Sequence, residues 1–177
     1  MSRRMLDTST VRSLLVLSLV SLLHGCASGR GTPVGHFPSI GLPLQTIALA
    51  PSGGIFADVI GIELAAHGYT IVDTGATLAL LMLMQKTQDE LFSPEVMDKL
   101  KERGIDAVLA VQKVDGTDGL PQTVQIRLHS TALLADVADV NWENKWIRRG
   151  IMETAREIAA AVSQEIRSVE PPSAPKQ

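Results

Sequence analysis

The first 25 residues place a short apolar run behind a small cluster of arginines. Arg3, Arg4 and Arg12 precede the apolar run 14–23, and small residues follow it. A positive segment, an apolar segment and small residues at a cut site together form a secretory signal. The run has about 10 residues, whereas a helix that spans a bilayer needs about 20, so the pattern favours a signal over a membrane-spanning anchor.

After residue 45 the pattern changes to short apolar runs that alternate with segments of helical periodicity. The order β-α-β-α-α-β-β-β-α predicts a single α/β domain, with a mixed sheet of about five strands and helices packed on it. Helical crossovers should join the first strands, and the last three strands should form an antiparallel meander. The predicted strands are 46–50, 69–72, 107–114, 123–129 and 137–146, and the predicted helices are 55–67, 76–86, 94–103 and 151–166.

The first two predicted helices carry apolar faces that must be buried against another surface. In the first helix Ile55, Val59, Ile62 and Ala66 share one face, with Phe56 and Ile60 flanking it, and we expect this face to be buried. The second helix, 76–86, is apolar nearly all round, so we expect it to be deeply covered. The cover could come from a neighbouring subunit as easily as from this chain.

The composition fits one domain that is held together by packing alone. The chain has 177 residues and a net charge of −3. Removal of residues 1–25 leaves about 152 residues and a net charge of about −5. Only one cysteine is present, so no disulfide can form within the chain. No basic patch stands out, which argues against a nucleic-acid partner.

The residues at the end of the signal resemble a known modification site. Leu23-His24-Gly25-Cys26 resembles the bacterial lipobox, in which a lipid is attached to the cysteine sulfur and the chain is cut just before it, after Gly25. His24 departs from the small or apolar residue usual at its place. The resemblance implies a covalent lipid on Cys26, and Ala27 in place of Asp favours the outer membrane. An ordinary signal peptide followed by a chance cysteine is the alternative.

These interpretations divide the chain into four parts. Residues 1–25 are the lipoprotein signal peptide, and residues 26–45 are the lipidated cysteine and a flexible tether rich in Gly, Pro and Ser. The α/β domain covers 46–168, and 169–177 form a disordered tail. Because the tether is short, the domain should lie close to the bilayer surface.

Motifs that could carry chemistry are weak in this chain. Residues 51–54, Pro-Ser-Gly-Gly, lie between a strand and a helix, but they lack the lysine and the spacing of phosphate-binding loops, which favours a tight turn. Residues 115–119, Asp-Gly-Thr-Asp-Gly, lack the glutamate of a calcium loop and indicate a hairpin turn. No histidines have the spacing of zinc ligands, and no nucleophile motif is present. We therefore predict no metal, no cofactor besides the lipid and no enzymatic activity.

Trp142 and Trp146 fall on one face of the predicted strand 137–146. Aromatic residues make up only 3% of the sequence, so both indoles must contribute much burial. One interpretation places them in the core, against the last helix. The other places an indole at a subunit contact or at the membrane interface, where Trp is favoured.

Three stretches of the domain resemble a class of bacterial lipoproteins with a compact α/β domain. They are 47–51 together with 57–73, then 100–111, and then 124–128 with a further strand that ends in the tryptophans. The class includes the curli secretion lipoprotein CsgG, the TolB amino-terminal domain, the activator LpoB and the exopolysaccharide lipoprotein PelC. The resemblance lies in the fold pattern, and it implies a non-enzymatic part of an envelope assembly, which in some members is a ring.

The leading hypothesis is an outer-membrane lipoprotein that faces the periplasm as a structural or adaptor subunit of a secretion or envelope-assembly complex. Its partners would be the membrane, through the lipid anchor, other envelope proteins and copies of itself. Two alternatives stay open. One is a regulator that activates a cell-wall synthesis enzyme, as LpoB-like proteins do, and the other is a nucleotide-binding or hydrolytic enzyme that uses the turn 52–54.

Overall fold

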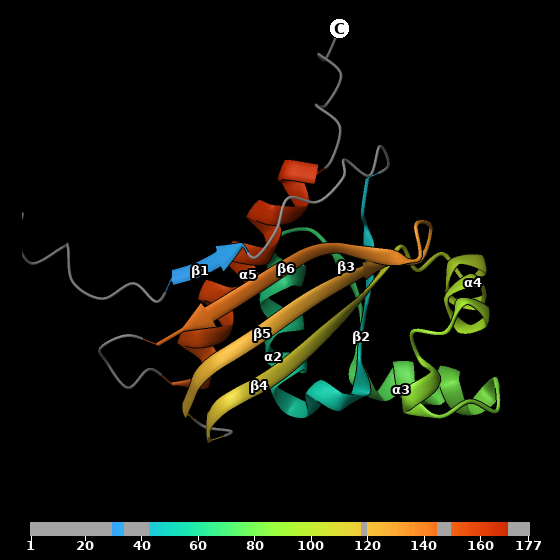
Figure 1. The fold of residues 1–177 in the computed structure, drawn as a ribbon, viewed down its shortest axis with the longest axis horizontal. Coiled ribbons are helices and arrows are strands. Elements are labelled where there is room, and N and C mark those ends of the chain that lie inside the picture. The colour runs from blue at the N-terminus through green and yellow to red at the C-terminus, as the bar shows by residue number, and fades with distance from the viewer. Residues whose placement is uncertain (1–29, 34–42, 118–119, 145–149, 170–177) are drawn as a thin grey trace, which may run out of the picture.

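The computed structural model describes residues 30–33, 43–117, 120–144 and 150–169, which form a six-stranded mixed sheet with helices on both faces (Figure 1). The strands are β1 Arg30–Pro33, β2 Thr46–Leu49, β3 Thr70–Val72, β4 Ala107–Thr117, β5 Leu120–Ser130 and β6 Ala135–Glu143. The helices are α2 Gly54–Ala66, α3 Thr74–Leu83, α4 Pro94–Glu102 and α5 Ile151–Val169, with short 3-10 helices η1 Pro51–Gly53 and η2 Gln88–Glu90.

The strand order in the sheet is β1-β6-β5-β4-β2-β3. β2 pairs in parallel with β3 and with β4, whereas β4, β5, β6 and β1 pair antiparallel. The predicted fold class is therefore confirmed, because the elements β2 to α5 follow the predicted order, with parallel strands joined by helices and a final antiparallel meander.

One strand of the sheet has no counterpart in the predicted elements. Arg30–Pro33 lies inside the segment 26–45 that the sequence predicts as a flexible tether, yet it pairs with β6, and Arg30 lies opposite Glu143. The residues Arg-Gly-Thr-Pro carry no alternating or continuous apolar pattern, so nothing local predicts a strand. β1 therefore forms through backbone pairing with the open edge of β6, where a proline is tolerated.

The sheet buries side chains on both faces. On one face α2 and α5 cover the alternating residues of β2, β4, β5 and β6, with Ile47, Leu49 and Leu109 at the centre. On the other face α3 and α4 cover β2, β3 and the beginning of β4, through Ala48, Val72 and Val108. The second layer is therefore short, and the meander continues beyond it (Figure 1).

Helix α2 turns a different face to the sheet from the one that the sequence predicts. The predicted buried face included Ile55 and Ile62, but both side chains are exposed. The residues of α2 that are buried are Phe56, Ala57, Ile60, Gly61 and Leu64. Because both stripes of the helix are apolar, hydrophobicity alone does not choose between them. The buried stripe contains Ala57 and Gly61, and their small size lets the helix backbone come close to the sheet.

Gly61 lies at the closest approach of α2 to the sheet. A Cβ atom at this position would lie 2.7 Å from Leu49 Cδ1 and 3.0 Å from Ile71 Cγ2. Leu49 is fully buried and cannot move aside freely. A side chain at position 61 would therefore push α2 away from β2 and β3.

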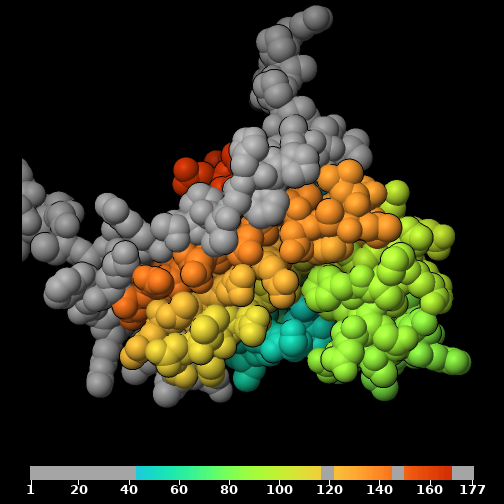
Figure 2. Space-filling view, in the orientation of Figure 1, coloured from blue at the N-terminus to red at the C-terminus, as the bar shows by residue number. Residues whose placement is uncertain are grey.

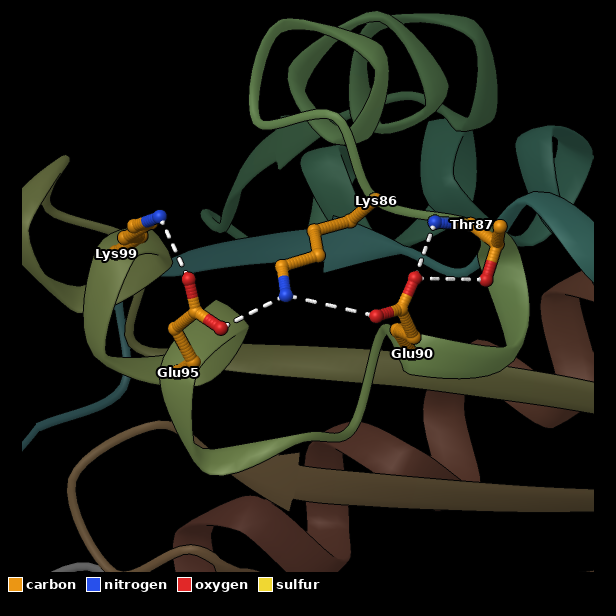
Figure 3. A network of polar contacts seen from close by, with 5 residues as sticks. All are labelled: Lys86, Thr87, Glu90, Glu95 and Lys99. Carbon is orange, nitrogen blue, oxygen red and sulfur yellow. Dashed lines mark hydrogen bonds and ion pairs between the residues drawn. The ribbon is translucent and has the colours of Figure 1, made fainter.

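A network of ion pairs joins the end of α3 to η2 and α4 (Figure 3). Lys86 Nζ lies 2.7 Å from Glu95 Oε2 and 3.5 Å from Glu90 Oε1, and Lys99 Nζ lies 3.0 Å from Glu95 Oε1. Glu90 also accepts a hydrogen bond from the backbone N–H of Thr87. The hydrogen bonds from Lys86 and then Lys99 lower the pKa of Glu95 from 4.5 to about 2. The network therefore fixes the chain that follows α3.

Substitution of Gly61 tests the close packing of α2. Gly61→Val should lower the free energy of unfolding by about 1–3 kcal/mol, because the added side chain overpacks a filled core. Ala65→Val is the matched control, since position 65 is exposed on the same helix and should lose only the difference in helix propensity, about 0.5 kcal/mol. Urea denaturation measures both, and equal losses would contradict the packing argument.

The ion-pair network predicts a stability change in acid. Because folding lowers the pKa of Glu95, its stabilising effect is complete above pH 4.5 and is lost as the pH falls through about 2. Glu95→Gln should therefore reduce the free energy of unfolding more at about pH 6 than at about pH 3. Glu102→Gln, on the same helix but outside the network, is the matched control for the loss of an acidic side chain. A pH-independent effect of Glu95→Gln would show that the network does not stabilise the fold.

Candidate functional site

The structure places only one of the residues that the sequence predicts for function. Cys26, Gly25 and Trp146 lie outside the described residues, so the lipidation site, the cut site and the contact of Trp146 stay predictions. Trp142 is fully buried in β6, and its indole N–H donates to Glu157 Oε2 at 3.2 Å. The structure therefore places Trp142 in the core of this chain, beside α5.

The position of β1 limits how far Cys26 can lie from the domain. Cys26 precedes Arg30 by four residues, and four residues span at most about 14 Å. Arg30 lies opposite Glu143 at the end of β6. A lipid on Cys26 would therefore be held near this end of the sheet.

The glycines after β2 have structural roles. A Cβ atom on Gly53 would lie 2.5 Å from Ala57 Cβ and 3.3 Å from Val111 Cβ, and Gly54 has a φ of +54°, which favours glycine. Both positions thus require glycine for packing or for backbone geometry. These requirements account for the sequence 51–54 as a tight turn.

The part of the chain that the structure describes offers neither a metal site nor a membrane-spanning helix. Within it, no group of three or more His, Cys, Asp or Glu side chains could hold a metal ion. Among the same residues, no helix has the length and apolar character needed to cross a membrane. Of the predicted turn at 115–119, Asp115 to Thr117 belong to β4, and residues 118 and 119 lie outside the described ranges.

Helix α3 is apolar on nearly every side, and the described part of its own chain covers it only in part. Thr77 and Leu81 are its buried residues, whereas Met82 and Leu83 are 69% and 76% exposed. Of the two sources of cover that the sequence leaves open, this chain therefore supplies only a part. The apolar sequence of this helix already indicated an exposed apolar surface, because a helix that is apolar all round presents more apolar surface than one neighbouring layer can bury.

A second pair of exposed apolar side chains lies on the neighbouring helix α2. Ile55 and Ile62 are 79% and 64% exposed, and helical spacing places Asp58 on the same face between them. Asp58 accepts hydrogen bonds from the backbone N–H and the hydroxyl of Thr74, at 2.9 and 2.8 Å, so α3 begins beside this face of α2. We refer to Ile55, Ile62, Ala79, Met82 and Leu83 as the α2–α3 surface.

The α3 part of this surface carries no charge. Residues 74–85 contain no Asp, Glu, Lys or Arg. The first charged residue after them, Lys86, is engaged by Glu95 and Glu90. An exposed, uncharged and apolar helix can bury area against a partner without the cost of removing ionised groups from water. Its chemistry fits protein contact rather than catalysis.

Comparisons with known proteins give matches to solved structures only. No protein family matches the chain, and no curated protein matches it. Among solved structures, a single-residue variant of the PelC dodecamer from Paraburkholderia phytofirmans aligns with a TM-score of 0.48 and 15% identity, over 78% of this chain and 98% of that one. The PelC dodecamer from the same organism aligns with a TM-score of 0.47 and 14% identity, over 78% of this chain and 97% of that one.

Proposed function

We propose that this chain is a lipid-anchored, non-enzymatic subunit of a secretion or envelope-assembly complex. In this proposal the lipid on Cys26 attaches the domain to the periplasmic face of the outer membrane, and the α2–α3 surface joins it to copies of itself. The observation that carries the proposal is the exposure of this surface, with Met82 69% and Leu83 76% exposed. Its lipid part is supported by the lipobox-like residues around Cys26.

A second copy of the same chain is the occupant that fits the α2–α3 surface. With a net charge of about −5 after removal of the signal, two copies repel each other over most of their surfaces. Residues 74–85 avoid this repulsion because none of them is charged. The cores of protein interfaces are likewise depleted of charge and rich in apolar side chains, including Met.

The anchor would also define which end of the domain lies near the membrane. Cys26 precedes Arg30 by four residues, and Trp146 follows Glu143, the partner of Arg30, by three. The chain length therefore ties both residues to the same end of the sheet. We include Trp146 in the proposal as a contact with the bilayer interface, where Trp is favoured.

The attachment would be stable only with more than one acyl chain. Each buried CH2 group contributes about 0.8 kcal/mol, and a single acyl chain binds a membrane only reversibly. Lipoproteins with the kind of motif that Leu23–Cys26 resembles carry two or three chains. A domain held in this way acts by its position, because the lipid fixes its height and leaves its surfaces free for partners.

Charge placed on α3 tests self-association. Met82→Asp in the mature chain with Cys26→Ser should weaken association at least about tenfold, because an ionised carboxylate would have to be buried. Met152→Asp, the same change at an exposed methionine on α5, should leave association unchanged. Light scattering after size exclusion measures both. A monomeric parent chain at high concentration would contradict the use of this surface.

Two substitutions near the cut site test the anchor. Cys26→Ser should abolish incorporation of labelled palmitate and release the protein from the membrane fraction. Ala27→Asp should keep the label but move the protein from the outer to the inner membrane. Sucrose-gradient fractionation of labelled cells separates the two effects. Equal labelling of the wild type and Cys26→Ser would refute the lipid anchor while leaving the self-association test unaffected.

A further inference from the structure

A cavity of about 290 Å³ opens where the connection between η2 and α4 meets the meander. It is lined by Phe92, Ala110, Arg127, His129 and Asp136. Figure 2 shows this side of the molecule, with the green atoms of α3 and α4 beside the yellow and orange atoms of β4 to β6. None of the lining residues belongs to the α2–α3 surface. The cavity exists because the second helical layer ends there and leaves the meander open.

Arg127 brings an unpaired guanidinium to this cavity. Asp139 lies opposite Arg127 in the register of β5 and β6, but its carboxylate accepts a hydrogen bond from Gln125 Nε2 at 3.4 Å instead. Within the described residues, no side chain forms an ion pair or a hydrogen bond with the Arg127 guanidinium. The five N–H donors of this group are therefore available to a ligand.

His129 is held in a fixed orientation beside Arg127. Its Nδ1 lies 2.9 Å from Asp136 Oδ1, and because a carboxylate only accepts, Nδ1 carries the proton. The imidazole also meets the ring of Phe92 edge-on, with 5.5 Å between the ring centroids and 68° between their planes. These two contacts leave Nε2 for a ligand and keep Asp136 occupied.

The other two lining residues, Phe92 and Ala110, are apolar. Phe92 is 42% exposed although it is a large aromatic side chain, and Ala110 adds a small apolar surface on β4. The cavity therefore combines the guanidinium of Arg127, the oriented imidazole of His129 and the aromatic ring of Phe92. Its volume lies just below the range of about 300–1,000 Å³ for ligand sites, which suits a small ligand.

We propose that this cavity binds a small organic anion. Its carboxylate or phosphate oxygen atoms accept hydrogen bonds from the Arg127 guanidinium, and its apolar part packs against Phe92. A guanidinium matches the geometry of both oxyanions with two parallel hydrogen bonds, so the two chemistries share this site. A cationic ligand fits less well, since the carboxylate of Asp136 is already paired with His129. The proposal is independent of the lipid anchor and of self-association.

Titration of the mature chain with simple aromatic anions tests the site. Benzoate represents the carboxylate source, phenyl phosphate represents the phosphate source, and benzyl alcohol is the neutral control. The imidazole signals of His129 in NMR spectra should shift saturably with at least one anion, at millimolar concentrations, and not with benzyl alcohol. The anion that binds more tightly identifies the chemistry of the natural ligand.

Variants of the lining residues separate a built site from general charge attraction. Arg127→Gln should weaken anion binding at least tenfold. Arg127→Lys should weaken it less, because the positive charge remains and only the two parallel hydrogen bonds of the guanidinium are lost. Arg167→Gln, at an exposed arginine on α5, should leave binding unchanged. Phe92→Ala should weaken phenyl phosphate but not inorganic phosphate. No saturable shift of His129 in the wild type, or equal binding by Arg127→Gln, would overturn the proposal.

Discussion

The close approach of α2 to the sheet at Gly61 determines how the rest of the domain is arranged. A helix with two apolar stripes must bury one of them, and the stripe with Gly61 and Ala57 lets the helix backbone come nearest to β2 and β3. The other stripe, with Ile55 and Ile62, then points outward. The close packing at Gly61 thus determines that Ile55 and Ile62 lie at the surface. Helix α3 adds its own exposed apolar side chains to this surface.

The uneven second layer has two functional consequences. Because α3 and α4 cover β2, β3 and only the first part of β4, they bury a small core of their own and leave the meander uncovered beyond it. The outer side of α3 carries the apolar α2–α3 surface, while the border of the layer, at Phe92, forms one wall of the cavity. The Lys86 network lies between these two features and links the end of α3 to η2 and α4.

Much of the fold could be predicted because β2, β4 and β5 carry strong local patterns, namely continuous apolar runs or strict alternation. β1 could not, since Arg-Gly-Thr-Pro carries no strand pattern of its own and pairs with β6 from a distant part of the sequence. The orientation of α2 depends on the shape of the sheet below it. The cavity combines Phe92 with Arg127 and Asp136, which are far apart in sequence, and no local pattern relates them. Hydrophobicity identified α3 as a helix that needs cover, but it does not say which molecule supplies the cover.

The pairing of β1 with β6 also determines how the domain responds to tension. A load applied at Cys26 reaches Arg30 first, because these residues are four positions apart. When the load acts along the strand axis, the hydrogen bonds between β1 and β6 resist it in shear and share it. When it acts across the sheet, they open one after another from Arg30 inward. The direction of pull thus decides whether the domain resists tension as a unit or lengthens by releasing its first strand.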